Sequence, residues 1–352
     1  PGRRALAGGD SGKAIEPGIS GESSLVFLVA GTDEEQRMPP IDEGTPLTEA
    51  EVATVRAWID QGANWPKSAD LDQVPRHHWA FRPIADPQPP GVKHTASVQN
   101  GIDAFILRKL EQEGISLSPE ATRATLIRRL HLDLIGLPPS GDDVQKWLND
   151  PRDDWYEHLV ADLLDSPHYG ERWARHWLDV ARYADSDGYE KDKPRPYAWR
   201  WRDWVIKAIN DDMPFDQFTT EQLAGDLFIK ASPRQQLATA FHRQTLRNRE
   251  GGTDQEEDRV KRVIDRVATT ARTWLGLTLE CAQCHNHPYD PITQRDFYQV
   301  YAFFNNTDEG GVKVPLAGGA THEADVMRHN GNRKTYLLRR GDFLQPDKKK
   351  GE

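Results

Sequence analysis

Apolar residues recur at intervals of three and four along most of the chain, the spacing that places them on one face of a helix. Ile102, Phe105, Ile106 and Leu110 form one such stripe. An alternating pattern typical of a strand is first seen at residues 335–338. The chain is therefore predicted to be mainly α, with helices over residues 47–61, 102–110, 119–135, 156–164, 169–183, 196–209, 218–227, 235–241, 256–275 and 297–304, and a further helix starting at Ser140 or Asp142.

Breaks in this pattern divide the chain into four parts. Residues 1–66 begin with a glycine-rich stretch and end with a helix that Gly62 terminates, so they are interpreted as a small module. Residues 67–100 are rich in proline and are predicted to be a linker. Residues 101–310 form the helical domain, and residues 311–352 are interpreted as a second linker.

Composition excludes some classes of function. The 352 residues carry a net charge of −10, and we see no dominant basic face, so nucleic acid is not expected as a partner. No run of about 18 apolar residues is present, so no membrane span is expected. The sequence starts at Pro1 without a signal peptide, and we expect a fragment or a processed product.

The two cysteines of the chain lie three residues apart in Cys281-Ala282-Gln283-Cys284-His285. C-x-x-C-H is the attachment signature of c-type haem. Residues three apart share a helix face, so two thiols can form thioethers to the two vinyl groups of one porphyrin. The adjacent His285 can then bind the haem iron as the proximal ligand.

Two other interpretations of this motif stay open. Cys281, Cys284, His285 and His287 could together bind zinc, because two cysteines and two histidines are a structural zinc set. The two thiols could instead form a redox disulfide. Pro288 follows closely and would stop a helix, so the motif is predicted to lie at a helix end, reached directly from the long helix over 256–275.

Longer stretches resemble the secreted, multidomain cytochrome-c-like proteins of planctomycete bacteria. Residues 1–66 resemble the C-terminal part of the cytochrome-c-like first domain of these proteins, through residues 8–12, 37–40 and 58–63. Residues 77–307 resemble their second domain, whose function is unknown and which bears the C-x-x-C-H motif. The matching stretches are residues 78–81, 130–139, 169–173, 185–204, 248–254, 265–270 and 274–292.

The resemblance implies a secreted or periplasmic protein that binds haem c and transfers electrons to an unidentified redox partner. It also implies further N- and C-terminal domains of the same polypeptide, missing from this chain. One alternative is a carbohydrate-active or other hydrolase that uses Asp and Glu side chains, with the Cys/His cluster structural or zinc-binding. Another is a non-catalytic interaction module.

Several other residues are candidates for binding. Met38 precedes a proline, as a distal haem ligand often does, and His176, Met213, His242 and Met327 are open choices for that position. Asp185 and Asp187 lie in an acidic segment with a glycine turn, which would suit calcium as an alternative metal. Arg195, Arg200 and Arg202 could pair with haem propionates or with acidic residues. A further polar site could be formed by Arg247, Arg249, Glu250 and Asp254. Asp254 can also cap the helix that follows it.

Overall fold

The computed structural model describes residue 6 and residues 13–32, 37–39, 45–65, 78–315 and 321–348. These residues form two compact units. One contains residues 1–83 together with residues 287–291, and the other contains residues 84–286 and 292–352. The glycine-rich stretch at residues 8–12 and the first part of the predicted linker, residues 67–77, lie outside the described residues.

The first unit is built on two helices, α2 (Ser24–Ala30) and α3 (Glu49–Asp60). Thr48 starts α3 through a capping box, in which its side chain accepts from the Glu51 backbone and the Glu51 carboxylate accepts from the Thr48 backbone. Val26 and Ile59 pack from these helices into a small core with Ile15 and Ala63. The predicted helix over 47–61 is therefore confirmed.

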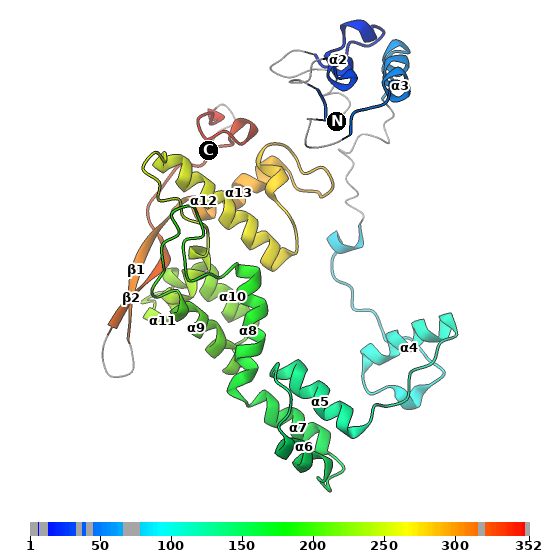
Figure 1. The fold of residues 1–352 in the computed structure, drawn as a ribbon, viewed down its shortest axis with the longest axis vertical. Coiled ribbons are helices and arrows are strands. Elements are labelled where there is room, and N and C mark those ends of the chain that lie inside the picture. Colours follow the sequence, from blue (N-terminus) through cyan, green and yellow to red (C-terminus); the bar gives the residue numbers. More distant parts are fainter. Residues whose placement is uncertain are drawn as a thin grey trace. The chain divides into compact units, whose positions relative to one another are not determined.

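The second unit is mainly helical, which confirms the predicted mainly α fold (Figure 1). No described helix combines the length and the apolar composition that a membrane crossing requires. The helices of this unit are α4 (Gly101–Glu113), α5 (Arg123–Leu134), α6 (Gly141–Leu148), α7 (Trp155–Leu164), α8 (Pro167–Ala181), α9 (Trp199–Asn210), α10 (Phe215–Ala224), α11 (Pro233–Ala238), α12 (Gln255–Thr270) and α13 (Gln294–Asn305).

Three apolar clusters hold the helices from α5 onward together. Helices α5, α6 and α7 meet around Ile127, Trp147 and Leu159. Helices α8 and α9 pack against each other and against α10 and α11, in a core that includes Trp201 and Phe241. A third cluster joins α12 and α13 to the turn that carries the two cysteines.

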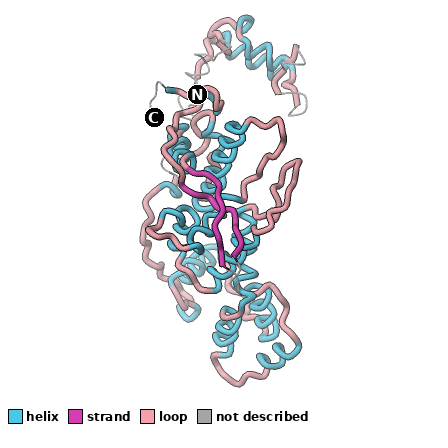
Figure 2. The backbone as a smooth tube through the Cα atoms, turned by 90° about the vertical axis from the view of Figure 1, so that its left-hand side faces the viewer, coloured by secondary structure: helices cyan, strands magenta, loops and turns pink. Residues whose placement is uncertain are grey.

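A β-hairpin, magenta in Figure 2, packs against α11 and the 3₁₀ helix Thr239–Arg243, and the sequence pattern did not predict it. Strand β1 (Thr307–Pro315) pairs antiparallel with β2 (Thr321–His329), from Thr307 opposite His329 to Pro315 opposite Thr321. Val312, Ala324 and Val326 face the helices and are buried. Residues 335–338, which we predicted as a strand, contribute only an isolated bridge between Leu338 and Pro346.

Helix α12 does not continue into the cysteine motif, so that prediction is wrong. It passes into a single π-helical turn, Ala271–Leu275, and ends at Gly276, whose backbone is left-handed (φ 63°). A separate 3₁₀ helix, Glu280–Gln283, then carries Cys281, and Cys284 is its C-terminal cap. The motif therefore does lie at a helix end, but the helix is a short one of its own.

Candidate functional site

The turn at Cys281–His285 presents its three reactive side chains to solvent. Cys281 and Cys284 are free thiols and are exposed, as is His285. Ala282, between the cysteines, is fully buried and packs into the same apolar cluster as Leu279 and Phe297. The buried alanine anchors the turn, so the thiols and the imidazole are held on its outer side.

The imidazole of His285 is oriented by its own backbone. Its Nδ1 lies 2.8 Å from the carbonyl oxygen of Asn286. A carbonyl oxygen only accepts, so Nδ1 carries the proton and Nε2 of the neutral ring keeps its lone pair. Histidines that bind a metal usually donate their other ring N–H in this way. The donor set of the turn, two free thiols and one imidazole with an available Nε2, therefore fits a c-type haem.

His287 has the opposite ring arrangement. Its Nδ1 accepts from the backbone N–H groups of Tyr289, at 3.2 Å, and Asp290, at 2.8 Å. In the neutral ring Nε2 must then carry the proton, and a protonated nitrogen cannot bind a metal. His287 thus lacks the available nitrogen that His285 has, and the zinc interpretation would require this arrangement to change.

The C-terminal segment packs against the cysteine turn. The Gln283 side chain donates to the Gly341 carbonyl at 3.4 Å, and Gln294 donates to the carbonyls of both Gln283 and Leu338. Gly341 has a left-handed backbone (φ 77°), and a Cβ atom placed there would lie 2.9 Å from Sγ of Cys284. Only a residue without a side chain allows this close approach.

The remaining candidate ligands lie apart from one another. Nowhere in the described ranges do three His, Cys, Asp or Glu side chains gather closely enough to hold a metal ion. Asp185 accepts a hydrogen bond from the Tyr183 hydroxyl, and Asp187 is fully buried between Arg195 and Arg249. The carboxylates proposed for calcium therefore have protein partners, and Asp187 is neutralised by two guanidinium groups.

The candidates for a distal haem ligand differ in exposure. Met38 belongs to the first unit and is about half exposed. Met327 lies in strand β2 and packs in the same buried cluster as Ala282 of the cysteine turn. His242 lies in the 3₁₀ helix Thr239–Arg243 and is fully buried. A distal ligand from among these residues stays a prediction.

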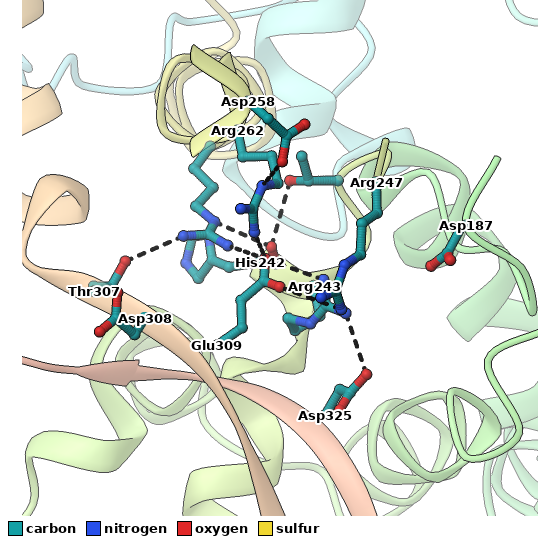
Figure 3. Close-up of polar contacts among 12 residues, drawn as sticks. Asp187, His242, Arg243, Arg247, Asp258, Arg262, Thr307, Asp308, Glu309 and Asp325 are labelled. Atoms are coloured by element: carbon teal, nitrogen blue, oxygen red, sulfur yellow. Dashed lines mark hydrogen bonds and ion pairs between the residues drawn. The ribbon is translucent and has the colours of Figure 1, made fainter. Parts of the chain in front are cut away.

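A buried cluster of arginines surrounds Glu309 on strand β1 (Figure 3). Oε1 of Glu309 lies 2.6 Å from Arg262, 2.8 Å from Arg266 and 3.2 Å from Arg243, and Oε2 lies 3.8 Å from Arg247. Arg262 and Arg266 are four residues apart on α12, so they project from the same helix face. The cluster thereby ties α12 to the hairpin.

Charge compensation controls ionisation in this cluster. Burial alone would raise the pKa of Glu309, but Arg243, Arg266 and Arg262 outweigh it and lower that pKa to about 2. Burial lowers the pKa of Arg266 to about 10, so this side chain stays charged at neutral pH. At neutral pH Glu309 is therefore an anion that neutralises part of the positive charge of the surrounding arginines.

His242 borders this cluster, and only its backbone takes part in the hydrogen bonds of the cluster. Its carbonyl accepts from Arg266 Nε at 3.3 Å, and its ring packs against Phe241 and Phe304. Neither ring nitrogen has a hydrogen-bond partner among the described residues. Burial, reinforced by the charge of Arg266, holds the pKa of His242 well below 6.5, so the ring is neutral at pH 7.

The polar residues at 247–254 do not form the single site that the sequence suggested. Arg249 contacts Asp187, whereas Arg247 faces Glu309. Asp254 caps α12 by accepting from two backbone N–H groups, as its position predicted. Glu250 shares a hydrogen bond with the Glu190 carboxyl, and this raises the pKa of Glu250.

Comparison with known protein families finds one family model that matches most of the second unit. Residues 101–309 match the model of the PSCyt2 family, described as a protein of unknown function (DUF1549). The chain belongs to this family. The match includes the cysteine turn and ends at Glu309, so it spans the whole arginine cluster. No curated protein and no solved structure matches the chain.

Sequence reasoning did not find the arginine cluster of this PSCyt2 domain. The signal that was present is the spacing of Asp258, Arg262 and Arg266, which places a carboxylate and two guanidinium groups on one face of α12. Asp258 does contact Arg262, at 2.9 Å. Glu309, the shared partner of Arg262 and Arg266, is over forty residues further along the chain, and no local pattern marks it.

Proposed function

We propose that the PSCyt2 domain attaches one c-type haem through Cys281 and Cys284, and that His285 binds its iron through Nε2. The observation that supports this most directly is the orientation of His285. Its Nδ1 hydrogen bond to Asn286 leaves Nε2 available, beside two exposed free thiols. A haem held in this way supplies reversible one-electron chemistry of its iron.

The residues of the turn would have separate tasks. The two thiols would fix the group covalently, and Asn286 would hold the imidazole in the required tautomer. Buried Ala282 would keep the turn rigid, because it packs into the apolar cluster beneath. The domain would then serve electron transfer in a secreted or periplasmic polypeptide, since thioether attachment in bacteria takes place outside the cytoplasm.

The proposal is tested by producing the chain in a bacterial host that matures c-type cytochromes. We expect a pyridine haemochrome spectrum of covalent haem, and a visible spectrum of the native protein that changes reversibly with dithionite and oxygen. Cys281→Ser/Cys284→Ser should lose the covalent haem. His285→Ala should keep a thioether-bound haem with an altered Soret band, because the iron loses one ligand.

His168→Ala is the matched control. His168 is also exposed and lies on helix α8, where its ring contacts Glu171. Its replacement should leave the spectrum unchanged. Absence of haem from the wild-type chain in this host, or an identical spectrum from the double cysteine variant, would refute the proposal.

A further inference from the structure

Helix α13 contacts the cysteine turn on both sides of Cys284 and His285. On one side, Gln294 Nε2 donates to the Gln283 carbonyl at 3.0 Å, and the Tyr298 hydroxyl donates to the same oxygen at 3.1 Å. Gln294 and Tyr298 are four residues apart, so they lie on one face of the helix. Cys284 therefore follows a carbonyl group that two side chains hold in place.

On the other side, α13 holds Asn286 by its side chain. The first backbone N–H groups of a helix have no partner within the helix. The Thr293 side chain accepts from one of them, that of Asp296. Asn286 Oδ1 accepts from another, that of Gln294, at 3.0 Å. Asn286 thus acts as a second cap of α13, although it lies eight residues before Gln294 in the chain.

Asn286 thereby connects the start of α13 to the imidazole of His285. Its side chain is bound to the helix, and its carbonyl oxygen lies 2.8 Å from His285 Nδ1. Any residue at position 286 would supply a carbonyl, but the Asn286 side chain anchors that carbonyl beside the ring. His285 is exposed, so water competes for both ring nitrogens unless the carbonyl stays in place.

We propose that Asn286 is the positioning residue of His285, and that its side chain fixes which ring nitrogen is available to the iron. With the side chain anchored, Nδ1 keeps the proton and Nε2 keeps its lone pair. Without this anchor, the ring exchanges between its two neutral tautomers in water. A hydrogen bond at Nδ1 also makes the ring a more basic ligand, which favours the ferric state of the iron.

The tautomer can be measured in the full chain without haem, by long-range ¹H–¹⁵N NMR of protein labelled with ¹⁵N-histidine. At about pH 8.5 histidine side chains are ordinarily neutral, and the signals that His285→Ala removes belong to His285. We expect a protonated Nδ1 and an unprotonated Nε2 in the wild type. Asn286→Ala should move both ¹⁵N shifts toward the averaged values of an exchanging ring. Asn286→Asp keeps an acceptor oxygen at the same distance along the side chain, so it should restore the wild-type shifts.

Two control variants show whether the effect belongs to this anchor. Tyr298→Phe removes a hydrogen bond to Gln283 and leaves the Asn286 contact intact, so the His285 shifts should stay as they are in the wild type. Asn100→Ala removes the asparagine that caps α4 in the same unit, and it should also leave His285 unchanged.

The iron gives a second measurement, and this part of the inference rests on the proposed function. In the haem-loaded chain, Asn286→Ala should have a more positive midpoint potential than the wild type, because the iron ligand is less basic. If no haem attaches, the proposed function fails, and the tautomer measurement still tests the role of Asn286.

Three results would overturn the role of Asn286. One is an Asn286→Ala variant that keeps the wild-type His285 shifts. Another is an Asn286→Asp variant that does not restore them. The third is a Tyr298→Phe variant that changes them as much as Asn286→Ala does, because any loosening of the turn would then have the same effect. An unchanged potential in haem-loaded Asn286→Ala would overturn the part that concerns the iron.

Discussion

Replacing Glu309 by glutamine tests whether charge compensation stabilises the PSCyt2 domain. The substitution Glu309→Gln keeps the shape of the side chain and removes its charge. Arg243, Arg262 and Arg266 would then face one another across a buried space without their shared anion. Breaking a buried ion pair by removing one partner is strongly destabilising, because the remaining charge stays buried and uncompensated.

The size of the effect follows from the pKa of Glu309. That pKa is about 2 in the folded domain, against an ordinary value of 4.5. Each tenfold change in proton affinity corresponds to about 1.4 kcal/mol, so the ionised carboxylate contributes about 3 kcal/mol to the free energy of unfolding. Because the folded pKa is the lower one, this contribution is fully present above pH 4.5 and is lost as the pH falls through about 2.

Hydrogen exchange of the backbone amides in α12 and β1 measures this free energy within the second unit itself. At about pH 6 we expect Glu309→Gln to lower the opening free energy by about 3 kcal/mol. The difference between variant and wild type should narrow as the pH is lowered from about 4.5 toward about 2, because the carboxyl of the unfolded wild-type chain is then protonated while the pKa of the folded one is about 2.

Glu256→Gln provides the control for this experiment. Glu256 also pairs with an arginine, Arg259, at 2.7 Å, but its side chain is 59% exposed. Exposed ion pairs contribute at most about 1 kcal/mol, so this variant should remain close to the wild type. If Glu309→Gln costs no more than Glu256→Gln, or if its cost is independent of pH, the reasoning about the cluster is wrong.

Two further substitutions address neighbouring features. The free energy of unfolding of the wild type should decrease below pH 6.5, by up to about 1.4 kcal/mol per pH unit, because the unfolded chain binds a proton that the buried His242 ring does not. His242→Phe should lack this pH dependence, which urea unfolding at about pH 7 and pH 5 measures. Gly341→Ala places a Cβ 2.9 Å from Cys284 Sγ on a left-handed backbone, and should displace the C-terminal segment. Cys284 should then react faster with Ellman's reagent, and an unchanged rate in the folded variant would contradict the packing described here.

The helices could be predicted from the sequence because their signals are local. Thr48, Ser140 and Asp254 cap the helices that follow them, and the apolar stripes give the buried faces. The hairpin could not be predicted in this way. Strand β1 contains Gly310 and Gly311 and has few apolar residues, so it lacks the alternation that marks a strand. Its pairing with β2 and its packing on the helices determine its structure.

The candidate site was also predictable from the sequence only where its signal is local. The C-x-x-C-H motif is contiguous, so its thiols and imidazole were identified from spacing alone. The orientation of His285 and of His287 depends on which backbone groups lie beside each ring, and the sequence does not reveal this. The arginine cluster depends on an acid from β1 that reaches residues of α12 and of the 3₁₀ helix before it, which is a tertiary contact.

The dependence of the arginine cluster on Glu309 has a consequence for when the domain can fold during its synthesis. The ribosome completes α12 before it adds β1, so the emerging chain holds Arg243, Arg262 and Arg266 before it holds Glu309, and Asp258 forms an ion pair with Arg262 alone. Mutual repulsion then opposes close packing of these helices. Stable folding of this part of the domain must therefore wait until the hairpin has been made.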